Sequence, residues 1–182
     1  MKNAILLHGT GGSDQDYFWF ASAKQLLEAD GYDVWWPLLP HTEKPTIHET
    51  EAFIVDNCPR MDENTIIIAR SSACPVVLDI LRRQTTELKQ VILVAGFYQS
   101  LDDDGYSDRM CYPRTSISLR RPSMPNRSRS LTQTMILGDE ARTVANRLDA
   151  KLVVAEGQGH MGSIIFNQPY RDFSLLNSLL DL

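Results

Sequence analysis

The sequence contains few cysteines and no long apolar run. Its 182 residues include three cysteines, Cys58, Cys74 and Cys111, whose odd number and irregular spacing match no zinc-binding or redox motif. This usage is typical of a reducing compartment, so we expect a cytoplasmic protein. No apolar segment approaches the roughly 20 residues that cross a bilayer, and the N-terminus is typical of a first strand rather than a signal peptide. We therefore expect no membrane association.

An excess of positive charge is also missing. The net charge of −5 argues against a nucleic-acid-binding protein, which normally presents a basic face. The four histidines are too scattered to predict a metal site. Hydrophobic residues make up 43% of the chain, enough for a core of ordinary size. We interpret residues 1–182 as one domain.

Short apolar runs alternate with helix-like segments along the chain. The expected strands are Ala4–Leu7, Val34–Trp36, Thr65–Ala69, Val91–Ala95, Thr134–Leu137 and Leu152–Ala155. The expected helices are Phe18–Ala29, Ile47–Asn57, Pro75–Arg83, a segment ending near Leu148 and one in the last dozen residues. This alternation predicts an α/β fold in three layers, with about six parallel strands and helices on both faces.

One long tract, residues 96–130, interrupts this pattern. It begins with acidic residues and continues with arginines at positions 109 to 129. A loop of this length is often functional, and an anion-binding rim over a site is one interpretation. Because charged runs commonly just face solvent, we favour the interpretation that this tract is a solvent-exposed loop.

The segment from Thr65 to Pro75 has the strand–turn–helix pattern of a nucleophile elbow. The sharp turn requires small residues two positions before and two after the nucleophile. Ala69 and Ala73 satisfy this requirement around Ser71, whereas Ser72 would have Arg70 at one of those positions. We therefore predict Ser71 as the nucleophile. The alternative is a plain strand-to-helix connection in which the serines cap the helix.

A serine hydroxyl needs a neighbouring base, and hydrolases with this elbow carry an acid and then a histidine further along the chain. His160, in a glycine-rich loop after the last strand, is the only histidine after Ser71. Asp139 follows the fifth strand and is predicted to orient His160. Glu140 is the rival acid, and both carboxylates could instead favour the start of the next helix.

Backbone N–H groups are predicted to bind the oxyanion of the reaction. We expect them from Ser72, after the nucleophile, and from Thr10 in the glycine-rich loop after the first strand. That loop could instead bind phosphate, but it matches neither the P-loop nor the dinucleotide motif. Trp19 is a candidate for lining an acyl pocket, with the helix core as its alternative. Arg70 is a candidate for contacting an anionic substrate.

These motifs together resemble the small serine hydrolases typified by the retinoblastoma-binding serine hydrolase and its short bacterial relatives. The resemblance covers nearly the whole chain, including the segments 8–12, 31–40, 74–78, 91–97 and 159–160. It implies a compact α/β-hydrolase with six parallel strands and no separate cap domain, and esterase-like activity on small acyl substrates. The chain differs at Arg70, where a histidine is usual, and in the short segment between Asp139 and His160.

From these features we expect a serine hydrolase that cleaves small-molecule acyl esters through an acyl-enzyme on Ser71. The altered elbow and the short acid segment motivate an alternative of a different class. In that alternative the hydrolase fold has lost robust catalysis and serves as a ligand- or partner-binding module.

Overall fold

A computed structural model describes residues 1–11, 18–43, 45–96, 131–135, 139–155, 157–163, 167–168 and 170–182, without side-chain detail at 131–135, 139–141 and 147. The strands are β1 (Asn3–Leu7), β2 (Asp33–Trp35), β3 (Thr65–Arg70), β4 (Gln90–Val94), β5 (Leu131–Met135) and β6 (Lys151–Leu152). The helices are α1 (Phe20–Ala29), α2 (Ile47–Asn57), α3 (Ala73–Arg83), α4 (Asp139–Leu148) and α5 (Ser174–Leu179). Residues 97–130, nearly all of the charged tract, lie outside the described residues. The absence of a separate cap domain therefore stays a prediction.

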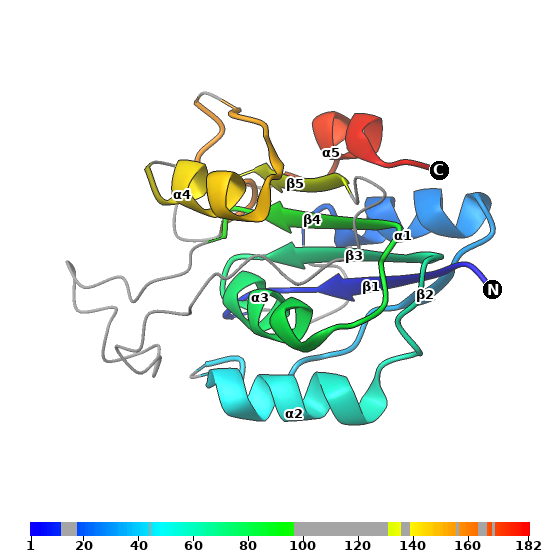
Figure 1. The fold of residues 1–182 in the computed structure, drawn as a ribbon. Helices are drawn as coiled ribbons and strands as arrows, with labels where there is room; N and C mark the ends of the chain where they lie inside the picture. Colours follow the sequence, from blue (N-terminus) through cyan, green and yellow to red (C-terminus); the bar gives the residue numbers. More distant parts are fainter. Residues whose placement is uncertain are drawn as a thin grey trace.

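The strands form one parallel sheet in the order β2-β1-β3-β4-β5-β6. Four strands of five or six residues make up its centre, and the short β2 and β6 lie at its edges. All six residues of β3 and all five of β4 are buried, as expected for strands covered on both faces. Because the strands are parallel, their carboxyl ends share one edge of the sheet (Figure 1).

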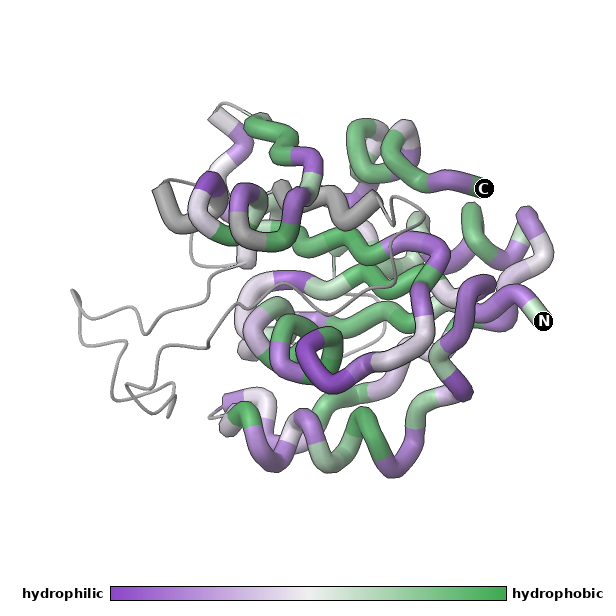
Figure 2. The backbone as a smooth tube through the Cα atoms, viewed as in Figure 1, coloured by the Kyte–Doolittle hydropathy of each residue, from purple (hydrophilic) through white to green (hydrophobic). Residues whose placement is uncertain are grey.

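Helices cover both faces of the sheet and make the three layers that the sequence predicted (Figure 1). Ile5, Ile67 and Leu93 point to one face and pack in a cluster with residues of α2, α3 and α4. Alternate residues such as Leu6 and Ile68 point to the other face, where α1 and α5 contribute to a second cluster. Strands β1, β3 and β4 are predominantly hydrophobic, whereas the helices carry hydrophilic positions on their outer sides (Figure 2).

Several element boundaries differ from those expected. The first helix starts at Phe20 because Phe18 adopts a φ of +55°, which a helix does not accommodate. The fifth strand starts three residues and ends two residues earlier than its apolar run suggested, because Leu131 to Met135 pair with the five residues of β4. The sixth strand pairs only through Lys151 and Leu152, short of the expected Leu152–Ala155. Helix Ile47–Asn57 has the predicted bounds.

Among the described residues, no helix combines the length and the apolar character required to cross a bilayer. The interpretation of residues 1–182 as one domain stays a prediction.

Candidate active site

Ser71 occupies a sharp turn between β3 and α3. Its φ of +52° lies in the left-handed region, which is unfavourable for a residue with a side chain and is kept only where the surroundings impose it. Two main-chain bonds do so: the Ser71 N–H donates to Val94 O (2.9 Å), and the Cys74 N–H donates to Ser71 O (3.0 Å). The strand, the strained serine and the helix start together give the geometry of a nucleophile elbow.

The neighbours of Ser71 are small, and the structure shows why they must be. Ala69 and Ala73 are 0% and 1% exposed, so larger side chains there would meet the packed core. Gly9 comes from the loop after β1, and a Cβ added to it would lie 2.6 Å from Ser71 Cβ. The carboxyl ends of β1 and β3 therefore meet at the serine.

The loop after β6 places His160 beside this serine. The His160 Nε2 lies 3.0 Å from Ser71 Oγ, although the two residues are 89 positions apart in the chain. The His160 N–H donates to Gln168 Oε1 (3.0 Å), which ties the start of the loop to the bridge between Ser163 and Gln168. Burial, reinforced by the charge of Arg70, lowers the pKa of His160 to about 4. The imidazole is thus neutral at pH 7, the state in which a ring nitrogen accepts a proton.

Asp139, the predicted acid, is the first residue of α4. The backbone position fits the alternative in which the two carboxylates favour a helix start. The side chains of Asp139 and of its rival Glu140 lie outside the described part of the chain. The assignment of the acid therefore stays a prediction.

The predicted oxyanion donors, Thr10 and Ser72, lie next to each other over the start of α3. The Thr10 N–H donates to Ser72 Oγ (2.7 Å), and the Thr10 hydroxyl donates to the same oxygen (2.9 Å). Ser72 is the N-cap residue of α3, but its side chain makes no capping hydrogen bond. Its hydroxyl instead holds the loop after β1 against the elbow.

Trp19 and Arg70, the two candidates for lining a substrate pocket, are both buried. Trp19 is 0% exposed and packs against Phe20 and Phe173, with ring centroids 4.1 Å and 5.5 Å away. Arg70 is 2% exposed, and its guanidinium lies 5.0 Å from the ring centroid of Phe18. Arg70 points to the same face of the sheet as Ile66 and Ile68, because side chains alternate along a strand. Both side chains belong to the interior on the α1 side.

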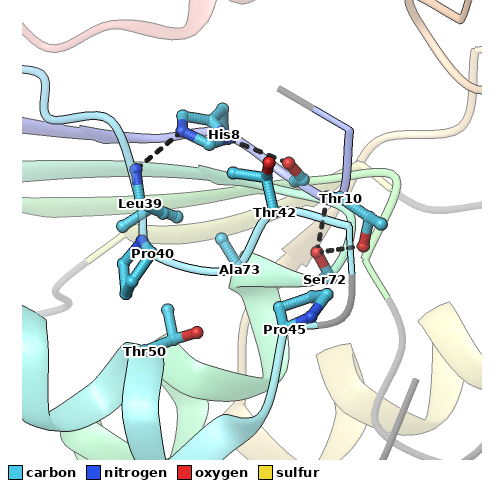
Figure 3. Close-up of a pocket in the computed structure, with 10 residues that line it drawn as sticks. His8, Thr10, Leu39, Pro40, Thr42, Pro45, Thr50, Ser72 and Ala73 are labelled. Atoms are coloured by element: carbon cyan, nitrogen blue, oxygen red, sulfur yellow. Dashed lines mark hydrogen bonds between the residues drawn. The ribbon is translucent and has the colours of Figure 1, made fainter. Parts of the chain in front are cut away.

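A small cavity adjoins the elbow on the opposite, α2 side of the sheet (Figure 3). It has room for about one water-sized group, and its walls include Thr10, Ser72, Ala73 and Thr50. Thr50 is 3% exposed, and its hydroxyl oxygen has no hydrogen-bond partner among the described residues. The surface of the cavity is mostly apolar, and the Thr50 hydroxyl is an unsatisfied polar group in its wall.

His8 forms the far wall of this cavity and has a structural role. Its Nε2 accepts from the Leu39 N–H (3.0 Å), so its Nδ1 carries the proton and donates to Gly9 O (2.9 Å). Burial lowers the pKa of His8, and a proton on Nε2 would break the bond to Leu39. These bonds hold the glycine-rich loop in its place beside Ser71.

Two of the side chains that shape the site had no signal in the sequence. Gln168 lies beyond the glycine-rich segment and resembles any polar surface residue. The Ser72 hydroxyl binds Thr10, which lies 62 positions away in the chain, so no local pattern indicates this bond. Within the described residues, no three His, Cys, Asp or Glu side chains are grouped so that they could hold a metal ion.

The parallel sheet and the strained serine at its carboxyl edge define an α/β-hydrolase fold. Solved structures agree. The ydeN gene product of Bacillus subtilis superimposes with a TM-score of 0.77, 20% identity and coverage of 98% of this chain and 96% of that one. An extracellular alpha/beta-hydrolase from a Paenibacillus species gives a TM-score of 0.54 at 12% identity, covering 93% and 95% of the two chains. A YdeN-like hydrolase from Pectobacterium atrosepticum gives 0.61 at 14% identity, covering 97% and 88%.

Sequence comparison identifies the family. Residues 4–165 match the model of the serine hydrolase family, so the chain belongs to that family. The hydrolase YdeN of Bacillus subtilis (strain 168) is 29% identical over 102 residues, 55% of this chain and 53% of YdeN. By sequence, the chain thus spans about half the length of this curated relative. The resemblance to small serine hydrolases is confirmed at the level of the family.

Proposed function

We propose that the chain is an esterase that hydrolyses small acyl esters through an acyl-enzyme on Ser71. The observation that carries this proposal is the 3.0 Å contact between Ser71 Oγ and Nε2 of a neutral His160. A serine becomes a nucleophile when a base within hydrogen-bonding reach takes its proton, and a neutral imidazole is such a base.

In the proposed reaction, Ser71 Oγ attacks the ester carbonyl while its proton passes to His160 Nε2. The tetrahedral intermediate collapses, the C–O bond to the alcohol breaks, and His160 returns the proton to the leaving oxygen. A water molecule then attacks the acyl-enzyme by the same route and regenerates Ser71. Asp139 is the proposed partner of His160 Nδ1. No cofactor takes part.

The oxyanion of the intermediate is proposed to bind the N–H groups of Thr10 and Ser72. In the structure without substrate, the Thr10 N–H donates to the Ser72 hydroxyl. The substrate carbonyl must therefore share or replace that acceptor. Because the charge on the oxygen grows only as the reaction proceeds, it competes better with Ser72 in the transition state than in the bound ester.

Two observations support a short acyl group and a cytoplasmic location. The cavity beside the elbow has room for about one water-sized group, and we propose that it takes the acyl group, which would favour acetyl over longer chains. Cys58 and Cys74 are both free thiols, as expected in a reducing compartment.

A fluorophosphonate probe tests the nucleophile directly. Wild-type protein should be labelled, Ser71→Ala should not, and His160→Ala should be labelled at least 10²-fold more slowly. Ser178→Ala is the matched control, because it removes an exposed serine hydroxyl of α5 and leaves Ser71 and its neighbours in place. Labelling that persists in Ser71→Ala would contradict the assignment.

A comparison of Asp139→Asn with Glu140→Gln tests the acid. The first variant should lower kcat strongly and the second should not. Esters of p-nitrophenol with two to eight acyl carbons test the substrate class, with the two-carbon ester expected to have the highest kcat/KM. Folded wild-type protein that neither labels nor hydrolyses these esters would favour the alternative, a binding module on a hydrolase fold.

A further inference from the structure

The loop that carries His160 is held from below by two buried side chains. Arg70 Nη2 donates to the Gly162 carbonyl and lies 3.4 Å from the His160 carbonyl oxygen. Trp19 Nε1 donates to the Met161 carbonyl oxygen at 2.9 Å. Three consecutive main-chain carbonyls of the loop, 160 to 162, therefore have side-chain donors from two distant parts of the chain.

The loop needs such donors because its backbone is unfavourable by itself. Gly159, Met161 and Gly162 all have positive φ values, +56°, +52° and +109°. Met161 has a side chain and is 1% exposed, so its left-handed conformation persists only if the surroundings impose it. The bonds to the carbonyls on either side of it, and to its own, supply that constraint.

An arginine suits this task for chemical reasons. Its guanidinium is planar and carries several N–H groups, so one side chain can reach two carbonyl oxygens, and it stacks on aromatic rings. Arg70 uses both properties: it bonds the loop and lies 5.0 Å from the Phe18 ring centroid. Its place in the chain adds to the effect, because Arg70 directly precedes Ser71. The residue that holds the histidine loop is covalently next to the nucleophile.

We propose that Arg70 is a positioning residue that, together with Trp19, sets the distance between His160 and Ser71 by holding the carbonyls of the histidine loop. This role rests on the proposed function for its effect on catalysis. It replaces the expectation that Arg70 contacts an anionic substrate. A buried guanidinium engaged with the loop is not placed to bind a substrate carboxylate.

Arg70 also changes the electrostatic environment of His160. Arg70 is the charged group among the described residues whose field acts on His160, and it lowers the pKa of that imidazole in addition to the effect of burial. Ser71 and the Gln168 amide, which face His160 from the elbow and from the following bridge, do not titrate. Loss of the guanidinium charge should therefore raise the pKa of His160.

The test compares Arg70→Met, Arg70→Lys and Trp19→Phe with Arg82→Met, which replaces an exposed arginine of α3 that pairs with Asp79. Hydrogen exchange of the peptide covering 157–163 reports the loop, and NMR titration reports the His160 pKa. With p-nitrophenyl acetate, Arg70→Met should lower kcat about 10²-fold and change KM less than threefold. Arg70→Lys should recover about tenfold of that loss, and Trp19→Phe should lower kcat several-fold. Arg82→Met should match wild type.

In Arg70→Met the 157–163 peptide should exchange at least tenfold faster, with peptides from α1 and α2 unchanged, and the acid limb of kcat/KM should move to higher pH. A folded Arg70→Met with wild-type exchange in 157–163 and wild-type kcat overturns the proposal. If wild type is inactive but the 157–163 peptide exchanges faster in Arg70→Met, the proposed function fails while the proposed positioning role of Arg70 stands. If Arg70→Met does not fold, Arg70→Lys and Trp19→Phe decide by the same readouts.

Discussion

Gly9 and Ser71 come from neighbouring strand ends and leave no space between them. A Cβ on Gly9 would lie 2.6 Å from Ser71 Cβ, 3.1 Å from the Arg70 carbonyl oxygen and 3.2 Å from Ser71 Oγ. The absence of a side chain at Gly9 thus sets the position of the serine hydroxyl.

Gly9→Ala should therefore impair both activity and stability. The added methyl must push the elbow away, because backbone and a strained serine cannot yield easily. We expect a loss of about 1–3 kcal/mol in the free energy of unfolding, measured in urea, and a fall of at least tenfold in the rate of fluorophosphonate labelling.

Gly31→Ala is the control for this substitution. Gly31 has a φ of +83° but open space around its Cβ position, far from the elbow in the chain. It should lose about 1–2 kcal/mol of stability from the backbone alone and keep its labelling rate. Equal labelling rates in both variants would refute the contact argument.

Acidification should destabilise the fold through His160. Its pKa falls from 6.5 to about 4 on folding, so below pH 6.5 the unfolded state binds a proton that the folded state excludes. This destabilisation is absent above pH 6.5, grows as the pH falls, and is complete below about pH 4. At about 1.36 kcal/mol per pH unit it reaches at most about 3 kcal/mol.

Urea titrations of wild type and His160→Gln between pH 7 and 4 test this point. The variant should lose less stability over that range. Part of the loss should remain, because burial also lowers the pKa of His8. Parallel curves for the two proteins would count against a buried neutral His160.

The same substitution at two threonines near the start of α2 should act in opposite directions. Thr50 buries an unsatisfied hydroxyl, so Thr50→Val should raise the free energy of unfolding by about 1 kcal/mol. Thr46 caps the helix by accepting from the Glu49 N–H (3.2 Å), so Thr46→Val should lower it by about 1 kcal/mol. Thermal or urea unfolding measures both. A destabilised Thr50→Val would indicate that its hydroxyl has a bound partner.

Reagents should distinguish the serine from the nearby thiol. Burial raises the pKa of Cys74 strongly, and the thiol donates to the Ala69 carbonyl oxygen (3.3 Å). In a Cys58→Ser, Cys111→Ser variant, iodoacetamide should leave Cys74 unmodified and the activity intact until the protein unfolds. Mass spectrometry after alkylation at pH 8 checks this. Rapid alkylation with loss of activity would point to a cysteine in the chemistry.

The sequence by itself determined the arrangement of elements and the sharp turn at Ser71, the predicted nucleophile. β-Branched runs, the helical segment at 47–57 and the small residues around Ser71 reflect local conformational preferences, which a sequence displays directly. The order of serine and histidine along the chain indicated His160, and this order can also be read from the sequence alone.

Tertiary structure alone decided the remaining features of the site. Strand pairing set the limits of β5 and β6. The polar side chains of these segments do not show which residues form backbone hydrogen bonds with a neighbouring strand. The burial of Trp19 and Arg70 beneath the histidine loop depends on packing between segments about 90 to 140 positions apart. The bond from Thr10 to the Ser72 hydroxyl likewise forms only when β1 and β3 lie side by side. These contacts are long-range, and no local pattern in the sequence encodes them.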